Sequence, residues 1–197
     1  MNAAAAAARP VDGSTQTDPR VVRTRREIAD AVRDLLMETG WDAVTHQNVA
    51  ERTGYARNTV YRHFPDRIDL FAHCADLDDE FGHAPRTGDV RTDLIGEMVA
   101  FRRALFEGPA GAIMSAVIER AIRDPEAVAM RDRIVGTGSA QTIEILEQAK
   151  AEGLIDGNAN PVDLNAALSG SVLYARLCRD VPPTDGAIAA LVDRVLA

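Results

Sequence analysis

The segment GYARNTVYRHFPDR, residues 54–67, concentrates side chains that can bind bases and phosphates. Val60 and Phe64 lie four residues apart, so they share one face of a helix, and Ala56 falls within about 40° of that face. The opposite face carries hydrogen-bonding side chains where a solvated surface would more often carry Glu and Lys: Asn58, Thr59, Tyr61 and Arg62. Asn pairs best with adenine and Arg with guanine, so this face is a candidate for reading DNA.

Charge is distributed unevenly along the chain. The 197 residues carry a net charge of −8, yet residues 1–72 contain ten Arg and ten Asp or Glu. The excess acid therefore lies in the remainder, as expected if one end of the protein faces a polyanion and the other does not. Between Asp18 and Glu27 there are arginines and no acid, and we interpret this run either as a solvated helix start or as an arm that contacts the DNA backbone or minor groove: Arg20, Arg23, Arg25 and Arg26.

Composition indicates a folded protein of the cytoplasm. Hydrophobic residues make up 46% of the chain, and no apolar run approaches the roughly 20 residues of a membrane span. Cys74 and Cys178 lie far apart and form no CxxC pair, so we expect reduced thiols. Residues 1–18 combine an uncharged start with a weakly apolar alanine run, so we expect a disordered tail there and not a signal peptide.

Helical periodicity dominates, and no stretch alternates long enough to require a sheet. Asp18-Pro19 and Thr45 are expected helix starts, while Gly40 and Gly54 are expected ends. Gly and Pro residues mark the boundaries between the predicted helices. These helices span 19–39, 46–52, 57–64, a fourth near 65–75, and then 90–107, 110–123, 125–153, 161–179 and 184–197. We therefore predict an all-α fold, with a three-helix helix-turn-helix bundle at 19–66 and a larger C-terminal helical bundle for regulation and dimerisation at 67–197.

The run VTHQNVAERTGYARNTVYRHFPDRIDLF, residues 44–71, closely resembles the DNA-binding signature of the TetR (tetracycline-repressor) family. The matching positions are Thr45 at the start of the second helix, Val49-Ala50 and Gly54 in the turn, and Thr59 to Phe64 in the recognition helix. Arg67 matches the basic residue that opens the fourth helix. Two positions depart from the pattern, because Ala56 replaces the small hydroxyl at the recognition-helix N-cap and His46 stands where the residue is often apolar.

The resemblance implies roles for individual side chains in contacting DNA. Thr45, Tyr61 and Arg67 are implied phosphate contacts, and Gln47 is placed to reach a phosphate from the second helix. His63 is interpreted as either structural or close to a phosphate. The implied base-reading or groove-facing group is Arg57, Asn58, Thr59 and Arg62.

For the C-terminal half the resemblance implies a homodimer that responds to a small ligand, because one recognition helix reads only half of a palindromic site. The expected pairing residues, which an ordinary helix core would also explain, are Leu168, Val172, Ile188, Leu191, Val192 and Val195. The expected walls of a pocket for a small apolar or amphipathic ligand, equally typical of any core, are Met98, Phe101, Leu105, Phe106, Ile113, Met114, Val117 and Tyr174.

Three other functions are alternatives to a DNA-binding regulator. The chain has no GxSxG, Walker, HExxH or dinucleotide motif, so we expect no enzyme and no cofactor. HCADLDDEFGH, residues 73–83, is a candidate metal site but reads more simply as an acidic, solvated helix end, so no metal is predicted. A helix-turn-helix used only for protein contacts is the third alternative. We predict a dimeric repressor that leaves palindromic double-stranded DNA when a small molecule fills its C-terminal bundle.

Overall fold

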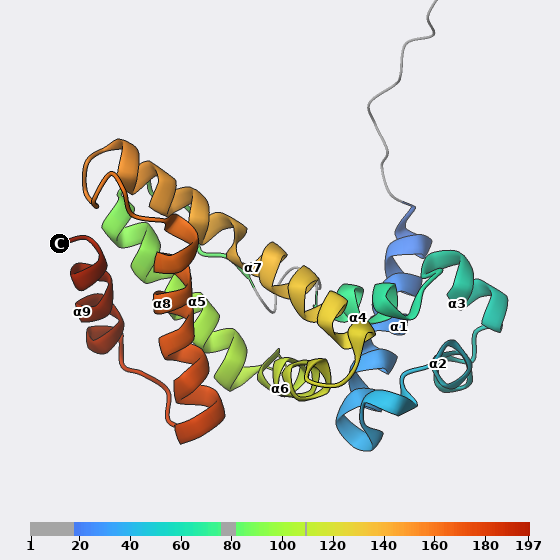
Figure 1. Ribbon diagram of the computed structural model, residues 1–197. Coiled ribbons are helices and arrows are strands. Elements are labelled where there is room, and N and C mark those ends of the chain that lie inside the picture. Colours follow the sequence, from blue (N-terminus) through green and yellow to red (C-terminus); the bar gives the residue numbers. More distant parts are fainter. Residues whose placement is uncertain (1–17, 76–81, 109) are drawn as a thin grey trace, which may run out of the picture.

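The computed structural model describes residues 18–75, 82–108 and 110–197, and within these ranges the chain contains helices and connections but no strand (Figure 1). The predicted all-α class is therefore confirmed. The helices are α1 (Pro19–Thr39), η1 (Trp41–Ala43), α2 (His46–Thr53), α3 (Arg57–His63), α4 (Arg67–Ala75), α5 (Val90–Glu107), α6 (Ala110–Ala121), α7 (Pro125–Ala151), α8 (Pro161–Tyr174), η2 (Ala175–Arg179) and α9 (Asp185–Val195). The expected tail lies outside the described residues apart from Asp18, which caps α1.

Local chemistry explains where the helices begin and end. Asp18 accepts from the backbone N–H of Arg20 at 2.9 Å, and Thr45 accepts from that of Asn48 at 3.1 Å, so both side chains satisfy free donors of a first turn. Gly54 ends α2 with φ of 74°, a left-handed conformation that glycine adopts without a steric cost. The predicted helix over 161–179 changes at Ala175 into a π-helical segment, η2. None of the helices among the described residues is long and apolar enough to cross a membrane.

Helices α1 to α4 form a compact head at one end of the molecule, and α5, α7, α8 and α9 form a body at the other (Figure 1). The core of the head is built by α1, the α2–α3 pair and α4, through the buried side chains Val32, Val49, Val60, Phe64 and Phe71. Because α4 contributes to this core, it packs as part of the head, although the sequence assigned it to the regulatory domain.

A second core holds the far part of the body together. It joins α5, α7, α8 and α9 through Leu94, Ile145, Leu168 and Val192, all of which are buried. The helix α7 takes part in both cores and runs from the head to the far end of the body (Figure 1). The two ends of the molecule are therefore connected by one continuous helix.

The loop at residues 82–89 is fixed to α5 by one buried carboxylate. Asp93 accepts hydrogen bonds from the backbone N–H and hydroxyl of Thr87 at 2.7 and 2.6 Å, from Gly88 N–H at 3.2 Å and from Arg86 Nε at 2.9 Å. The Thr87 hydroxyl, with the Thr87 and Gly88 amides and the Arg86 guanidinium, holds the pKa of the Asp93 carboxyl far below its usual range, against the opposing effect of burial. The ionised carboxylate therefore stabilises the folded loop.

Replacing Asp93 by Asn should lower the free energy of unfolding by about 2 kcal/mol at neutral pH, because charge-assisted hydrogen bonds to a buried acceptor are lost. Since the pKa is depressed in the fold, this stabilisation is present above the usual carboxyl pKa and is lost as pH falls through the folded value. Urea unfolding from pH 7 downward checks this. Asp163→Asn, at an exposed aspartate in the first turn of α8, is the control and should change stability little; equal effects of the two substitutions would contradict the prediction.

Candidate nucleic-acid interface

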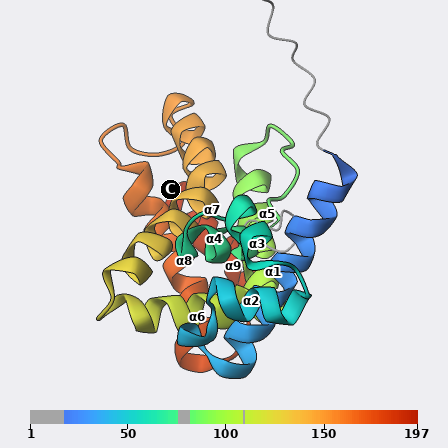
Figure 2. The same ribbon diagram turned by 90° about the vertical axis from the view of Figure 1, so that its right-hand side faces the viewer.

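The outer end of the head is formed by α2 and α3, which face the viewer in Figure 2. Val60 and Phe64 are buried against the head core, as the four-residue spacing predicted. Ala56 lies outside the predicted buried face, because it precedes the helix as an exposed N-cap with no side-chain capping bond. The exposed residues of α3, with Thr59 partly buried beside them, are Arg57, Asn58, Tyr61 and Arg62.

Tyr61 is held in place by a stack that the sequence did not reveal. Its ring lies parallel to the imidazole of His46, with centroids 3.9 Å apart and an interplanar angle of 4°. His46 is buried, and its Nε2 donates to the carbonyl oxygen of Phe64 at 2.7 Å. The guanidinium of Arg57 lies 5.4 Å from the Tyr61 ring centroid and donates to its hydroxyl at 3.2 Å. Tyr61 is 39% exposed, so its hydroxyl is presented to solvent on a fixed ring. The His at position 46, where the family pattern is often apolar, is the signal that could have predicted this contact.

Most arginines of the described chain pair with acids, but those near α3 do not. Among the described arginines that form no ion pair, five lie on α1 and α3, namely Arg20, Arg25, Arg26, Arg57 and Arg62, while Arg103, Arg179 and Arg194 lie in the body. Arg25 also covers the ring of Phe64 at 5.1 Å, which places the start of α1 beside α3. The face of the head around α3 and the start of α1 therefore carries arginines that no acid pairs, although the chain as a whole is acidic.

Arg67 is placed differently from the expected phosphate contact. Its Nε donates to the carbonyl of Val44 at 2.7 Å, a terminal nitrogen donates to that of Trp41 at 2.5 Å, and another pairs with Glu126 at 2.8 Å. The guanidinium also lies over the ring of Phe71 at 5.4 Å. These contacts join the head to α7 and use three of the five guanidinium N–H donors, so two donors remain for a phosphate.

The other side chains predicted to contact DNA differ in whether their hydrogen-bonding groups are already used within the protein. The Thr45 oxygen caps α2, but the hydroxyl proton is not used by that bond. Gln47 is exposed and donates to Glu51 one turn away. His63 is partly buried beside the positive charges of Arg62 and Arg25, and burial first, then those charges, lower the pKa of its imidazole. We therefore expect a neutral ring in the absence of DNA.

The expected pairing residues are mostly core residues of the protomer. Leu168, Val172, Ile188 and Val192 are buried inside their own chain, while Leu191 and Val195 are partly buried, and the pairing role of these residues stays a prediction. The apolar stripes of α8 and α9 therefore lie on the sides of these helices that pack against the body of the same chain. The opposite side of α8, η2 and the following loop exposes small and apolar residues: Ala166, Ala167, Gly170, Ser171, Tyr174, Leu177 and Val181.

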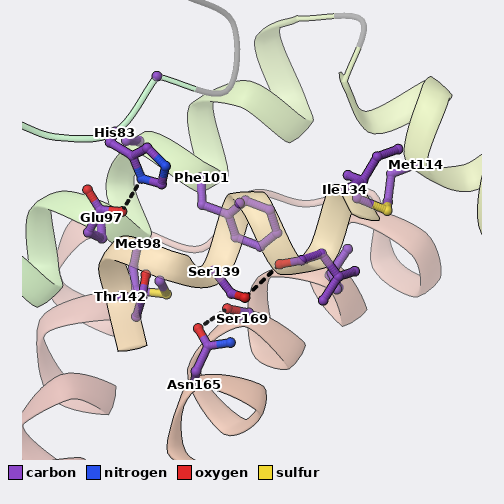
Figure 3. Close-up of a pocket in the computed structure, with 15 residues that line it drawn as sticks. His83, Glu97, Met98, Phe101, Met114, Ile134, Ser139, Thr142, Asn165 and Ser169 are labelled. Atoms are coloured by element: carbon purple, nitrogen blue, oxygen red, sulfur yellow. Dashed lines mark hydrogen bonds and ion pairs between the residues drawn. The ribbon is translucent and has the colours of Figure 1, made fainter. Parts of the chain in front are cut away.

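A cavity of about 80 Å³ lies within the body between α5, α6, α7 and α8. Three predicted residues line it: Met98, Phe101 and Met114. The others do not, because Leu105, Ile113 and Val117 are packed into the head-side core, Phe106 lies under Arg176, and Tyr174 is 61% exposed on the outer side of α8. Sequence reasoning missed the polar members of the lining, which include His83, Glu97, Ser139, Thr142, Asn165 and Ser169 (Figure 3).

Two family models match this chain. The model for bacterial regulatory proteins of the tetR family matches residues 28–74, and the model described as the tetracyclin repressor-like C-terminal domain matches residues 84–195. The chain belongs to the TetR family. The two matched ranges meet between α4 and α5, which agrees with the packing of α4 in the head.

Relatives and solved structures of the TetR type resemble the whole chain. The HTH-type transcriptional regulators Mb1581 of Mycobacterium bovis and Rv1556 of Mycobacterium tuberculosis are each 29% identical over 189 residues, which cover 94% of this chain and 91% of theirs. The TetR family transcription regulator SCO0332 superposes with a TM-score of 0.69 at 27% identity, covering 88% of this chain and 97% of its own. Salmonella enterica GusR shares the fold, with a TM-score of 0.65 at 18% identity over 93% of this chain and 97% of its own. The chain is therefore a TetR-family DNA-binding transcriptional regulator.

The candidate metal site of this TetR-family chain falls largely outside the described residues, since Asp76, Asp78, Asp79 and Glu80 lie in 76–81. In the described part of the chain, no three or more His, Cys, Asp or Glu side chains are grouped to hold a metal ion. His83 instead lies 2.8 Å from Glu97 through its Nδ1.

The pKa of His63, measured by NMR titration of the free protein, should lie below the usual value of 6.5. Arg62→Ala should raise it by removing a nearby positive charge, and Arg20→Ala, at an exposed arginine of α1, should leave it unchanged. Because the folded pKa is lowered, the fold should lose stability as pH falls from the usual histidine pKa through the folded one. A His63 pKa above 6.5, or one insensitive to Arg62→Ala, would contradict this account.

Proposed function

We propose that this TetR-family protein is a homodimeric repressor that binds a palindromic operator and leaves it when a small molecule occupies the cavity in the body. The observation that carries the proposal is the outer face of α3, where exposed Arg57 and Arg62 have no acidic partner in the described chain and Tyr61 is fixed by His46. Such a face supplies guanidinium groups for base edges and phosphates. The protein would act by binding alone, in the cytoplasm, where bacterial DNA is read.

Pairing through the outer side of α8 supports two-fold recognition. Ala167, Gly170 and Ser171 are small and exposed, which lets two helices approach closely, and Tyr174 and Leu177 extend an apolar surface along the same side. A two-fold dimer would place two α3 helices against half-sites about 34 Å apart, one turn of DNA.

The cavity is close enough to the head core for a ligand to affect DNA binding. Met114 and Ile134 line the cavity and also belong to the core cluster that includes Phe64 and Phe71 of the head. A ligand that binds more tightly when the head is in its DNA-free position would shift the population away from DNA. The joint through Arg67 and Glu126 would move as part of the same change.

Selection of genomic fragments by the purified protein should enrich a palindromic site. Arg62→Ala should weaken binding to that site by about 1–3 kcal/mol, or roughly 5- to 150-fold, whereas Arg103→Ala, at an exposed arginine of α5, should not. Titrations at two salt concentrations should give a steep loss of affinity with salt for wild type. Binding without salt dependence, or equal effects of the two substitutions, would favour a helix-turn-helix used for protein contacts.

Ala167→Glu should convert the dimer to a monomer, because it places a carboxylate in a closely packed helix contact. Ala129→Glu, at an exposed alanine of α7 in the part near the head, should leave the dimer intact. Sedimentation velocity distinguishes the two states. An Ala167→Glu protein that remains dimeric would place the pairing surface elsewhere.

A further inference from the structure

The cavity in the body is amphipathic, and its polar side carries one carboxylate. Glu97 is 4% exposed, and its Oε1 accepts from the backbone N–H of Ala84 at 2.7 Å and from Gln141 Nε2 at 2.8 Å. Its Oε2 accepts from His83 Nδ1 at 2.8 Å. His83, Glu97 and Thr142 lie toward one end of the cavity, whereas Met114 and Ile134 lie at the other, with Phe101 between them (Figure 3).

No lysine or arginine is found among the described residues that line this cavity. The Glu97 charge is therefore met only by amide donors and one imidazole, and a ligand carboxylate or phosphate would bring a second negative charge without a partner. A ligand cation would instead be attracted by the carboxylate and by the face of Phe101. The charge of the lining selects against anions.

The serine hydroxyls add acceptors to the same cavity. Ser139 donates its proton to the carbonyl of Val135 at 2.6 Å, and Ser169 donates its proton to Asn165 Oδ1 at 3.1 Å. Both hydroxyl oxygens are left as acceptors, so the cavity lining offers acceptors for ligand N–H groups in addition to Glu97.

Two buried side chains keep unused hydrogen-bonding capacity at the cavity. Thr142 is 2% exposed and Asn165 is 7% exposed. Within the described chain, the Thr142 hydroxyl and the Asn165 amide NH2 have no hydrogen-bond partner. Neither atom is fully enclosed by protein, so both line accessible space and are free to bond a ligand that carries an acceptor beside its cation.

We propose that the ligand of this cavity is a small organic cation, an amine that also carries a hydroxyl or carbonyl group on a short apolar body. This rests on the proposed ligand-responsive function and names the chemistry of its effector. The volume of about 80 Å³ is roughly half of the 150 Å³ that holds benzene, so the occupant is smaller than benzene in this conformation.

Calorimetry and thermal shift with three matched probes test the proposal: 3-amino-1-propanol, its uncharged analogue 1,3-propanediol and the anion 3-hydroxypropanoate. At millimolar concentrations the aminoalcohol should bind and stabilise the protein, and the diol and the acid should bind at least tenfold more weakly. Equal binding of the three, or no binding of the aminoalcohol, would overturn the proposal. These binding measurements use no DNA, so they test the ligand chemistry independently of operator release. Operator release is tested separately, by titrating the selected operator with the protein in the presence and absence of the aminoalcohol.

Variants locate the selectivity. Glu97→Gln should weaken binding of the aminoalcohol at least tenfold, while Glu107→Gln, at an exposed glutamate at the end of the same helix, should not. Thr142→Val removes a hydroxyl with no protein partner, so it should leave stability unchanged or raised and yet weaken binding about threefold or more. Unchanged affinity in a folded Glu97→Gln protein would overturn the proposal, and if that variant does not fold, unchanged affinity in Thr142→Val would do so.

Discussion

The apolar core that continues from the head into α6 and α7 governs what the rest of the molecule can do. Trp41 and Phe71 stack with centroids 4.0 Å apart, and Arg67 covers both rings while it pairs with Glu126 of α7. Close-packed interiors respond to a displacement by shifting as units, since they have no free space to absorb it. From this packing we expect the head to move together with α6 and the first half of α7.

The cavity lies beside that attachment. Ile134 ends the head-side core along α7, and Ile145 begins the body core, so the cavity lies where the two cores meet. Between them α7 contains Gly136 and Gly138, residues with low helix propensity, and Ser139 bonds back to the carbonyl of Val135. Under the proposed function, a ligand that fills this region would change the contact between the two packed cores and so alter the distant DNA interface.

The body and the α3 face of the head differ in how their arginines are paired with acids. Acids of the body pair with arginines of the body, as in Arg91 with Asp193 at 2.6 Å and Arg102 with Asp185 at 2.5 Å, whereas Arg57 and Arg62 of the head have no such partner among the described residues. An acidic body weakens attraction of the whole protein to any nucleic acid, so affinity depends on the contacts that α3 makes.

The sequence by itself determined the features that depend on neighbours along the chain. The spacing of Val60 and Phe64, the cap at Thr45 and the left-handed Gly54 define the helix-turn-helix because capping, turns and helical period act within a few residues. Tertiary structure decided the rest. An apolar stripe such as Leu168 and Val172 does not say whether a partner or its own core covers it, and only the fold brings Glu126 to Arg67, His46 under Tyr61 and Gln141 to Glu97. Side chains far apart in sequence meet only through packing, which no local pattern encodes.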